Sequence, residues 1–278
     1  MRFGAHVSIA DNLADAVDRA SALGCEAMQI FPGNPRGWRP GYFKADQAAE
    51  FRRRRRRTDI RPLAIHLPYL VNLGSPIDRV FAASIGSIQD ALAKAKTIEA
   101  DFVVTHTGSH VGAGRRHGLE RIKAGLKELL KGDFGRVKLL LENTAGAGFT
   151  VGDRLEEISE IIASTGGDAR IGLCLDTCHA YAAGYDLADA AGLREFVDSL
   201  DGLIGLQRVG LIHANDSKGA LGSRSDRHEH IGKGHIGLKG WRRILREPAF
   251  EDQTFIIETP RPEPDDDRRN LATLRGLL

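Results

Sequence analysis

Short apolar, β-branched stretches recur along the chain, and nearly all of them end on a polar side chain. The stretches are FGAHV, AMQIF, LAIHL, FVVTH, LLLEN, LCLDT, GLIHA and FIIET. The residues at or just past their ends are His6, Phe31, His66, His106, Glu142, Asp176, His213 and Glu258. Because burying His, Glu or Asp without a partner is costly, unrelated accidents would not fall at the same place in so many units. The pattern indicates a cation where the strands converge.

Segments with helical periodicity separate these stretches. They run over 11–23, 45–57, 77–97, 116–131, 153–164, 189–199, 237–246 and 265–277, with Asp11 and Asp153 as candidate start residues. No Pro/Ser-rich linker interrupts residues 1–278, so we expect one domain. The alternation predicts an α/β fold, a (β/α)8 TIM barrel whose site lies at the carboxyl ends of the strands. An open doubly wound sheet would place a Gly-rich turn where this chain has HVSIAD.

Composition narrows the class of protein only a little. The chain has 278 residues, 42% of them hydrophobic and 27% charged, with a net charge of +2, which does not by itself announce nucleic acid. The N-terminus lacks the apolar core of a signal peptide, and no run approaches the roughly 18 apolar residues of a membrane span. The cysteines Cys25, Cys174 and Cys178 form no CxxC motif, which argues against a disulfide framework. We expect a cytoplasmic protein.

Nine residues are candidate metal ligands. They are His66, His106, Glu142, Asp176, His179, His213, Asp226, His228 and Glu258. Imidazoles and carboxylates without a thiolate suit zinc, with manganese or iron as alternatives, and so many ligands imply two or three ions. Asp226 and His228, two apart in the long loop 214–236, would face the same side of an extended segment. Three divalent ions would carry more charge than four carboxylates, which favours an anionic substrate such as a phosphodiester.

Other polar residues have plainer interpretations. We expect surface or hydrogen-bonded rim positions for His6, His110, His117, His230 and His235, and packing roles for Cys174 and Cys178. The run Arg52–Arg57 falls in a predicted helix, where side chains spread around the axis by about 100° per residue. We therefore expect a solvated outer helix, with non-specific phosphate attraction as the alternative.

Long segments resemble a known family. LENTAGAG, CLDTCHAYAAGYD and HANDSKGALGSRSDRHEHIGKG are similar to the signature regions of endonuclease IV, a family of apurinic/apyrimidinic (AP) endonucleases in the xylose isomerase-like TIM barrel superfamily. GAHVS, HLPYLVNLGSP and THTGSH resemble it too, so the similarity covers about residues 2–260. The resemblance implies three zinc ions. It assigns His66, His106 and Glu142 to the first ion, Glu142 with Asp176, His213 and Glu258 to the second, and His179, Asp226 and His228 to the third.

The resemblance also implies an activity. A zinc-activated hydroxide would attack the phosphodiester 5′ to an abasic site in double-stranded DNA, leaving a 3′-hydroxyl and a 5′-deoxyribose phosphate, as in base-excision repair. Glu142 and Glu258 would orient or deprotonate the water. Three residues match the family's DNA-inserting loops: Arg36, Tyr69 and Leu70. Departures from the family's pattern at Ala147, Tyr181 and Lys233 affect loop packing and DNA contacts, not the ligands.

Other DNA contacts and other functions remain open. Trp38 is a candidate for DNA contact or for packing under its loop, and Arg115, Arg116, Arg224 and Arg227 are candidates for backbone contacts. The main alternative is a metal-dependent sugar isomerase or epimerase, which would have no use for the Asp226–His228 loop or an inserting residue. A catalytically silent lesion binder would predict a broken ligand set, whereas all nine positions are intact. Nothing demands more than a monomer.

Overall fold

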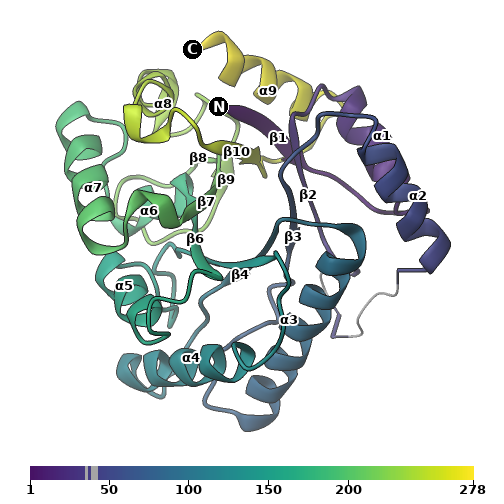
Figure 1. Cartoon of the computed structure of the whole chain (residues 1–278). Coiled ribbons are helices and arrows are strands. Elements are labelled where there is room, and N and C mark those ends of the chain that lie inside the picture. The colour runs from purple at the N-terminus through teal and green to yellow at the C-terminus, as the bar shows by residue number, and fades with distance from the viewer. Residues whose placement is uncertain (35–36, 39–42) are drawn as a thin grey trace.

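Eight parallel strands close into a barrel in the computed structural model, which describes residues 1–34, 37–38 and 43–278. Around the barrel the strands follow the order β1-β10-β7-β6-β5-β4-β3-β2 (Figure 1). They are β1 (Arg2–His6), β2 (Ala27–Ile30), β3 (Leu63–His66), β4 (Phe102–His106), β5 (Lys138–Glu142), β6 (Ile171–Asp176), β7 (Val209–His213) and β10 (Thr254–Ile257). The TIM barrel predicted from the alternation of strands and helices is confirmed.

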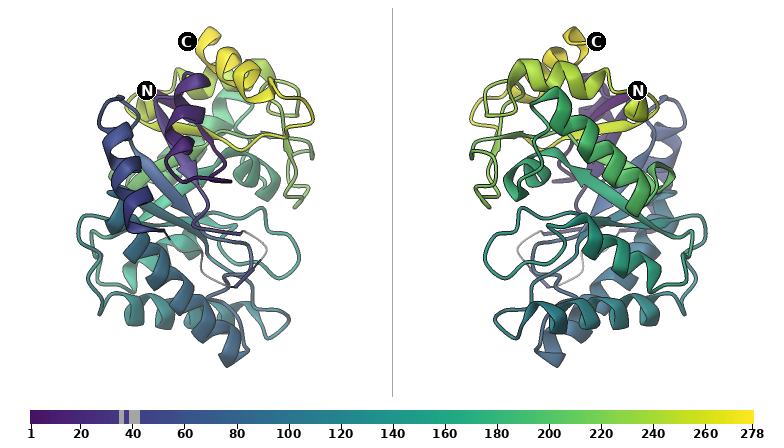
Figure 2. Two further views of the ribbon diagram at one scale, coloured as in Figure 1. Left: turned by 90° about the vertical axis from the view of Figure 1, so that its right-hand side faces the viewer. Right: turned by 90° about the vertical axis from the view of Figure 1, so that its left-hand side faces the viewer.

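Helices pack around the outside of the strands, as the side views show (Figure 2). They are α1 (Asp15–Ala22), α2 (Ala45–Arg55), α3 (Asp78–Ile98), α4 (Arg115–Leu129), α5 (Leu155–Ala163), α6 (Thr177–Ala183), α7 (Ala190–Leu203), α8 (Gly237–Leu245) and α9 (Asp266–Gly276). Two 3₁₀ turns, η1 (Leu206–Arg208) and η2 (Pro248–Phe250), precede β7 and β10. Within the described part of the chain, no helix has the length and apolarity to cross a membrane.

The structure differs from the sequence prediction at four places. Helix α1 begins at Asp15 because Asp11 has a left-handed backbone (φ 69°), so the chain is still turning there. Asp153 does not cap α5, and its carboxylate pairs with Arg115 instead. Helix α6 was not predicted, and the long loop 214–236 holds a small antiparallel pair, β8 (Asp216–Ser217) and β9 (His228–Glu229).

An apolar layer fills the middle of the barrel. Nearly every strand contributes one inward-facing residue to a buried cluster: Ala27, Ala64, Val104, Leu140, Cys174, Leu211 and Ile256. On β1 the matching position is Gly4, which lies in register with Ala27 and Ile256. A Cβ at Gly4 would approach the carbonyl oxygen of Ala27 to 2.1 Å, so this position accepts no side chain. The layer forms the floor on which the candidate site is built.

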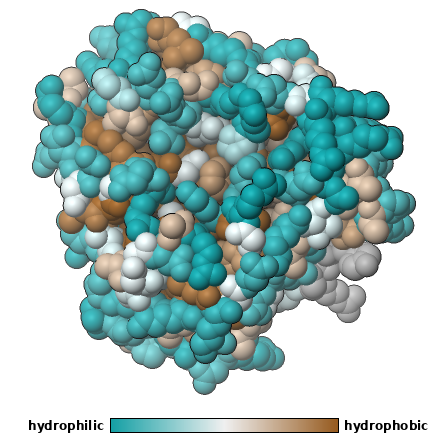
Figure 3. Space-filling model, in the orientation of Figure 1, coloured by the Kyte–Doolittle hydropathy of each residue, from teal (hydrophilic) through white to brown (hydrophobic). Residues whose placement is uncertain are grey.

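The arginine run at the end of α2 binds neighbouring helices. Arg54 pairs with Asp15 and Asp18 of α1, and Arg56 pairs with Glu99, which follows α3. This end of α2 leads into β3, so it lies opposite the carboxyl ends of the strands. Hydrophilic side chains cover the surface over α1 and α2 (Figure 3). The ion pairs support the outer-helix interpretation of the run rather than a binding surface.

The close approach at Gly4 predicts a large loss of stability on substitution. Gly4→Ala forces β1 and β2 apart, and we expect the free energy of unfolding to fall by about 2–3 kcal/mol. Gly86→Ala is the control, because Gly86 lies in the exposed middle of α3, and no atom of the described residues lies within 4 Å of an added Cβ. It should raise stability by up to about 1 kcal/mol. Chemical denaturation followed by circular dichroism measures both, and equal midpoints for the two variants would contradict the packing argument.

Candidate metal centre

A polar layer lies directly above the apolar one. Side chains two residues apart on a strand face the same side of the sheet, so each strand's next inward residue points toward the barrel axis. Counting two residues on from Gly4 and the apolar cluster gives His6, Gln29, His66, His106, Glu142, Asp176, His213 and Glu258. All eight are polar. The sequence pattern therefore predicted seven members of the layer correctly in position, but named Phe31 on β2, where the inward residue is Gln29.

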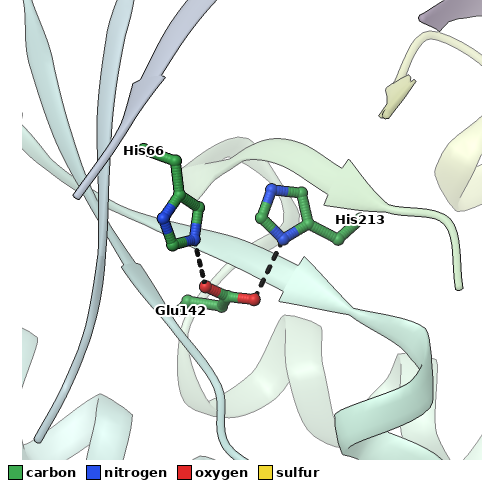
Figure 4. Close-up of side chains that lie close together, drawn as sticks. All are labelled: His66, Glu142 and His213. Atoms are coloured by element: carbon green, nitrogen blue, oxygen red, sulfur yellow. Dashed lines mark hydrogen bonds and ion pairs between the residues drawn. The ribbon is translucent and has the colours of Figure 1, made fainter. Parts of the chain in front are cut away.

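Glu142 lies at the centre of this layer and is almost completely buried, with 1% of its surface exposed. Its Oε2 lies 2.9 Å from Nε2 of His66, and its Oε1 lies 2.9 Å from Nδ1 of His213 (Figure 4). His106 approaches from β4, with Nδ1 3.5 Å from Oε2 of Glu142. One carboxylate from β5 thus holds imidazoles from three other strands.

The charges in the layer shift one another's pKa values. Burial would raise the pKa of Glu142, but His106 and His213 hold it well below its usual value. Burial would likewise lower the pKa of His213, yet the surrounding acidic groups, Glu258 and Glu142 among them, raise it well above the ordinary value. Burial lowers the pKa of His106, which favours its neutral form. The layer therefore concentrates ionised carboxylates that demand cationic partners.

Asp176 and His179 come together through a short helix. Asp176 ends β6 and caps α6, since its Oδ1 accepts a hydrogen bond from the backbone N–H of His179 at 2.7 Å. Its Oδ2 accepts one from Nδ2 of Asn215 at 2.7 Å. Burial would lower the pKa of His179, but Asp176 and Asp226 raise it to about 10. The Asp-Thr-Cys-His segment is thus a capped helix start, which the sequence analysis did not predict.

The long loop 214–236 brings Asp226 and His228 to the same place. Asp226 Oδ1 lies 3.1 Å from Nε2 of His179, and His228 Nε2 lies 3.5 Å from Asp226 Oδ1 and 3.6 Å from Asp176 Oδ2. The buried carboxylate of Asp216 organises this loop. It accepts hydrogen bonds from the backbone N–H groups of Ser217, Gly232, Ile236 and Gly237. The loop is therefore anchored from inside rather than loose.

Most of the imidazoles are oriented by backbone carbonyl groups. Nδ1 of His66 donates to the carbonyl of Leu67 at 2.7 Å, and Nδ1 of His179 donates to that of Asn143 at 2.9 Å. Nδ1 of His228 lies 3.1 Å from the carbonyl of Glu258. In the neutral ring that a metal ion binds, donation through Nδ1 leaves Nε2 unprotonated and available as the ligand atom. In each case a carboxylate oxygen lies within 3.6 Å of Nε2.

These side chains fit a set of metal ions. Among the described residues, the groups whose ligand atoms lie within 4.8 Å of one another include His66–Glu142–His213, His179–Asp226–His228 and Glu142–Asp176–His213–Glu258. Within the described part of the chain, the buried Nε2 atoms of His106, His179 and His228 make no hydrogen bond, although a carboxylate oxygen lies within 3.6 Å of the last two. A buried nitrogen without a partner is costly unless something binds it, and a divalent cation satisfies it. Of the nine predicted ligands, only His106 lies outside these groups.

Three functional residues escaped the sequence analysis. Gln29 contacts both His213 and Glu258, while Asn143 and Asn215 tie the strand ends together. Asn143 exchanges hydrogen bonds with the backbone of Asp176, and Asn215 accepts one from the backbone N–H of Glu258. The signal for Gln29 was the two-residue spacing from Ala27. The signal for both asparagines was their place just after a strand's terminal Glu or His.

Residues expected to be peripheral behave accordingly. None of His110, His117, His230 and His235 belongs to the close ligand groups found among the described residues. Cys178 does lie near Asp176 and His228, but burial raises its pKa strongly and its Sγ contacts the carbonyl of Arg227 at 3.5 Å, as expected for a packed thiol. Arg115 is bound by the carboxylates of Asp153 and Glu157, so it ties a loop to a helix rather than reaching outward.

Two cavities open beside the polar layer, and Tyr69 lines both. One, of about 420 Å³, is lined by His6, His228, Glu258 and Arg261; the other, of about 180 Å³, by His106, His179 and Asp226. Tyr69 is 67% exposed and stacks on His106 with ring centroids 5.2 Å apart. Leu70 and Trp38 are also exposed. Arg36 lies outside the described residues.

Comparisons with known proteins give one consistent result. A model of the xylose isomerase-like TIM barrel family matches residues 17–277. The chain is 43% identical to the probable endonuclease 4 of Halothermothrix orenii over 94% of both chains. It is 41% identical to the probable endonuclease 4 of Chloroflexus aurantiacus, over 100% of this chain and 98% of the relative.

Solved structures agree with this result. The crystal structure of endonuclease IV from Thermus thermophilus superposes with a TM-score of 0.90 at 42% identity, covering 100% of this chain and 98% of that one. A D-tagatose 3-epimerase-like protein superposes with a TM-score of 0.73 at 22% identity, covering 100% of this chain and 97% of that one. At that identity the second likeness shows the fold alone.

The anchoring role of Asp216 predicts a selective effect on metal binding. Asp216→Asn places an amide NH2 against backbone N–H donors, so the loop that carries Asp226 and His228 loses its anchor. We expect the affinity for one ion to fall about 10–100-fold while the others are retained. Metal content per chain, measured by mass spectrometry after dialysis against graded chelator, tests this. Asp198→Asn, on the exposed face of α7, is the control, and identical metal retention in both variants would refute the role.

Proposed function

This chain belongs to the endonuclease IV family within the xylose isomerase-like TIM barrel superfamily, and from that premise we propose that it is a metal-dependent AP endonuclease. Its substrate is double-stranded DNA that carries an abasic site, and it hydrolyses the phosphodiester on the 5′ side of that site. The observation that carries the proposal is Glu142, a buried carboxylate held by three imidazoles beside histidine nitrogens that make no hydrogen bond to any described residue.

Three zinc ions would be held by the nine ligands, with manganese or iron as substitutes. His66, His106 and Glu142 would hold the first, Glu142, Asp176, His213 and Glu258 the second, and His179, Asp226 and His228 the third. Divalent ions at such a site lower the pKa of water and neutralise charge on phosphate oxygens. The mixture of imidazole and carboxylate donors suits zinc.

The two glutamates differ in what they can do to the attacking water. Glu142 has both oxygens engaged by histidines and 1% of its surface exposed, so it holds the cluster together. The side chain of Glu258 is 17% exposed and lines the larger cavity. Burial would raise the pKa of Glu258, but His213 and His6 hold it well below its usual value, so the group is ionised. Glu258 is therefore better placed than Glu142 to orient the attacking water.

The reaction balances without a further co-reactant. Water adds to phosphorus, the bond from phosphorus to the 3′ oxygen breaks, and that oxygen takes up a proton. The products are a 3′-hydroxyl and a 5′-deoxyribose phosphate. Tyr69 and Leu70 would enter the gap left by the missing base, since both are exposed and the ring of Tyr69 stacks on that of His106, a proposed metal ligand. Arg36 remains a proposal from the resemblance alone. A monomer suffices for this chemistry.

A sugar epimerase on the same barrel is the alternative. It accounts for the fold and for the ions around Glu142, but it gives no role to Asp226 and His228 in their anchored loop. Nor does it explain why Tyr69 stands exposed between two cavities. We therefore favour the nuclease.

Cleavage of a duplex with one synthetic abasic site tests the proposed function. The metal-loaded protein should cut once, 5′ to the lesion, and leave an end that a polymerase extends. Chelator treatment should abolish the cut, and Glu142→Gln should lower its rate at least about 100-fold because it removes the charge shared by two ions. Glu195→Gln, on the exposed face of α7, should match the wild type. If the fully metallated protein leaves the duplex intact, the proposal fails, and epimerisation of small ketoses becomes the next assay.

The inserting role of Tyr69 makes a separate prediction. Tyr69→Ala removes a stacking surface, so kcat/KM on the abasic duplex should fall about 10–100-fold while metal content stays at the wild-type level. Leu203→Ala is a matched control, since Leu203 is also exposed but ends α7, on the opposite side of the barrel from the site. Steady-state kinetics and mass spectrometry give the two readouts. Unchanged kinetics in Tyr69→Ala would remove Tyr69 from the DNA interface.

A further inference from the structure

Gln29 is the one member of the eight-residue polar layer whose side chain is neither a common metal ligand nor titratable. It lies on β2 in register with His6 of β1, and none of its surface is exposed. Its amide nitrogen lies 2.6 Å from Oε1 of Glu258 and 3.1 Å from Nδ1 of His6. Its amide oxygen lies 3.0 Å from Nε2 of His213. Each of the three contacts of this amide therefore ends on another member of the layer.

The orientation of the amide is fixed by its partners. An ionised carboxylate can only accept hydrogen bonds, so the group 2.6 Å from Glu258 must be the NH2. The reversed amide would place two oxygens against each other in a buried site, which is strongly unfavourable. The oxygen of Gln29 consequently faces His213. Because an amide oxygen only accepts, Nε2 of His213 must carry a proton and donate it.

This contact determines which nitrogen of His213 is available to a metal ion. With Nε2 occupied, Nδ1 is the ligand atom, and it lies 2.9 Å from Oε1 of Glu142 and 3.3 Å from Oε2 of Glu258. His66, His179 and His228 have the opposite arrangement, in which a backbone carbonyl holds Nδ1 and leaves Nε2 free. Among these four rings, His213 alone depends on a side chain for its orientation.

We propose that Gln29 is a positioning residue of the second metal site, which selects Nδ1 of His213 and aims the carboxylate of Glu258 as ligands of the same ion. The inference rests on the proposed function in assuming that this ion is bound. Gln29 lines neither of the two cavities beside the site, so it would act through His213 and Glu258 rather than by contact with the substrate. An amide is suited to this task because one group supplies an acceptor for an imidazole and a donor for a carboxylate.

The test compares Gln29→Met, which keeps the length of the side chain and removes its hydrogen bonds, with the wild type. Competition with a chromophoric chelator measures zinc affinity, and the visible absorption of the cobalt-substituted protein reports ligand geometry. We expect the affinity for one ion to fall about 10–100-fold and the cobalt spectrum to change. Cleavage of the abasic duplex should fall at limiting zinc and recover in excess zinc. A variant that was only less stable would bind and cut normally at a temperature where it is folded.

Gln253→Met is the matched control, because Gln253 is half-buried just before β10, at the other end of the barrel. It should leave zinc affinity and the cobalt spectrum unchanged. If Gln29→Met also leaves the zinc affinity and the cobalt spectrum unchanged, the inference is wrong while the proposed function stands. If the wild type binds no ion and cuts no abasic duplex, the proposed function itself fails.

A measurement on the wild type covers the case in which Gln29→Met does not fold. In the zinc-loaded protein, ring ¹H–¹⁵N correlation spectra distinguish a protonated nitrogen from a metal-bound one. The signal of His213 is identified by its absence in His213→Asn. We expect its Nε2 to be protonated and its Nδ1 to be bound to the metal. A metal-bound Nε2 would overturn the inference.

Discussion

The crowding of four carboxylates, three of them buried or partly buried, with five imidazoles at one end of the barrel is the constraint on which the site depends. An ion pair of this kind repays its desolvation only when every partner is in place, and loss of one partner leaves an uncompensated buried charge. Glu142 shows the constraint most clearly, since its two oxygens hold His66 and His213 from different strands. Barrel closure supplies the geometry, because it brings the end of β5 within reach of β3 and β7.

The remainder of the site consists of devices that hold these charged groups in place. Asp176 uses one oxygen for the start of α6 and the other for Asn215, which fixes its direction. Asp216 gathers backbone N–H groups and thereby stiffens the loop that delivers Asp226 and His228. Below them, the apolar layer fills the middle of the barrel, and Gly4 leaves no room for a side chain at its position. Because these side chains are already held in place, less conformational entropy would be lost when a metal ion binds to them.

The sequence allowed the barrel and the position of most polar residues to be predicted, because strand periodicity and strand ends are local properties. Gln29 was missed because the apolar run AMQIF extends past the inward position, so the end of the run pointed to Phe31 instead. Helix α6 was missed because its first residue follows a strand with no turn between them. The anchoring by Asp216 could not be predicted, since its donors lie up to twenty-one residues away and meet only when the loop is folded.

The histidine rings of the candidate metal centre are oriented in two ways, by backbone carbonyl groups or by a side chain. Rings held by the carbonyls of Leu67, Asn143 and Glu258 keep their orientation whatever side chains those residues carry, because the acceptor belongs to the backbone. The ring of His213 is held by the amide of Gln29, so a single substitution on a neighbouring strand changes its acceptor. The same amide also holds Glu258, the carboxylate that reaches the larger cavity. The proposed second metal site and the carboxylate that reaches the cavity would therefore be coupled through one neutral side chain.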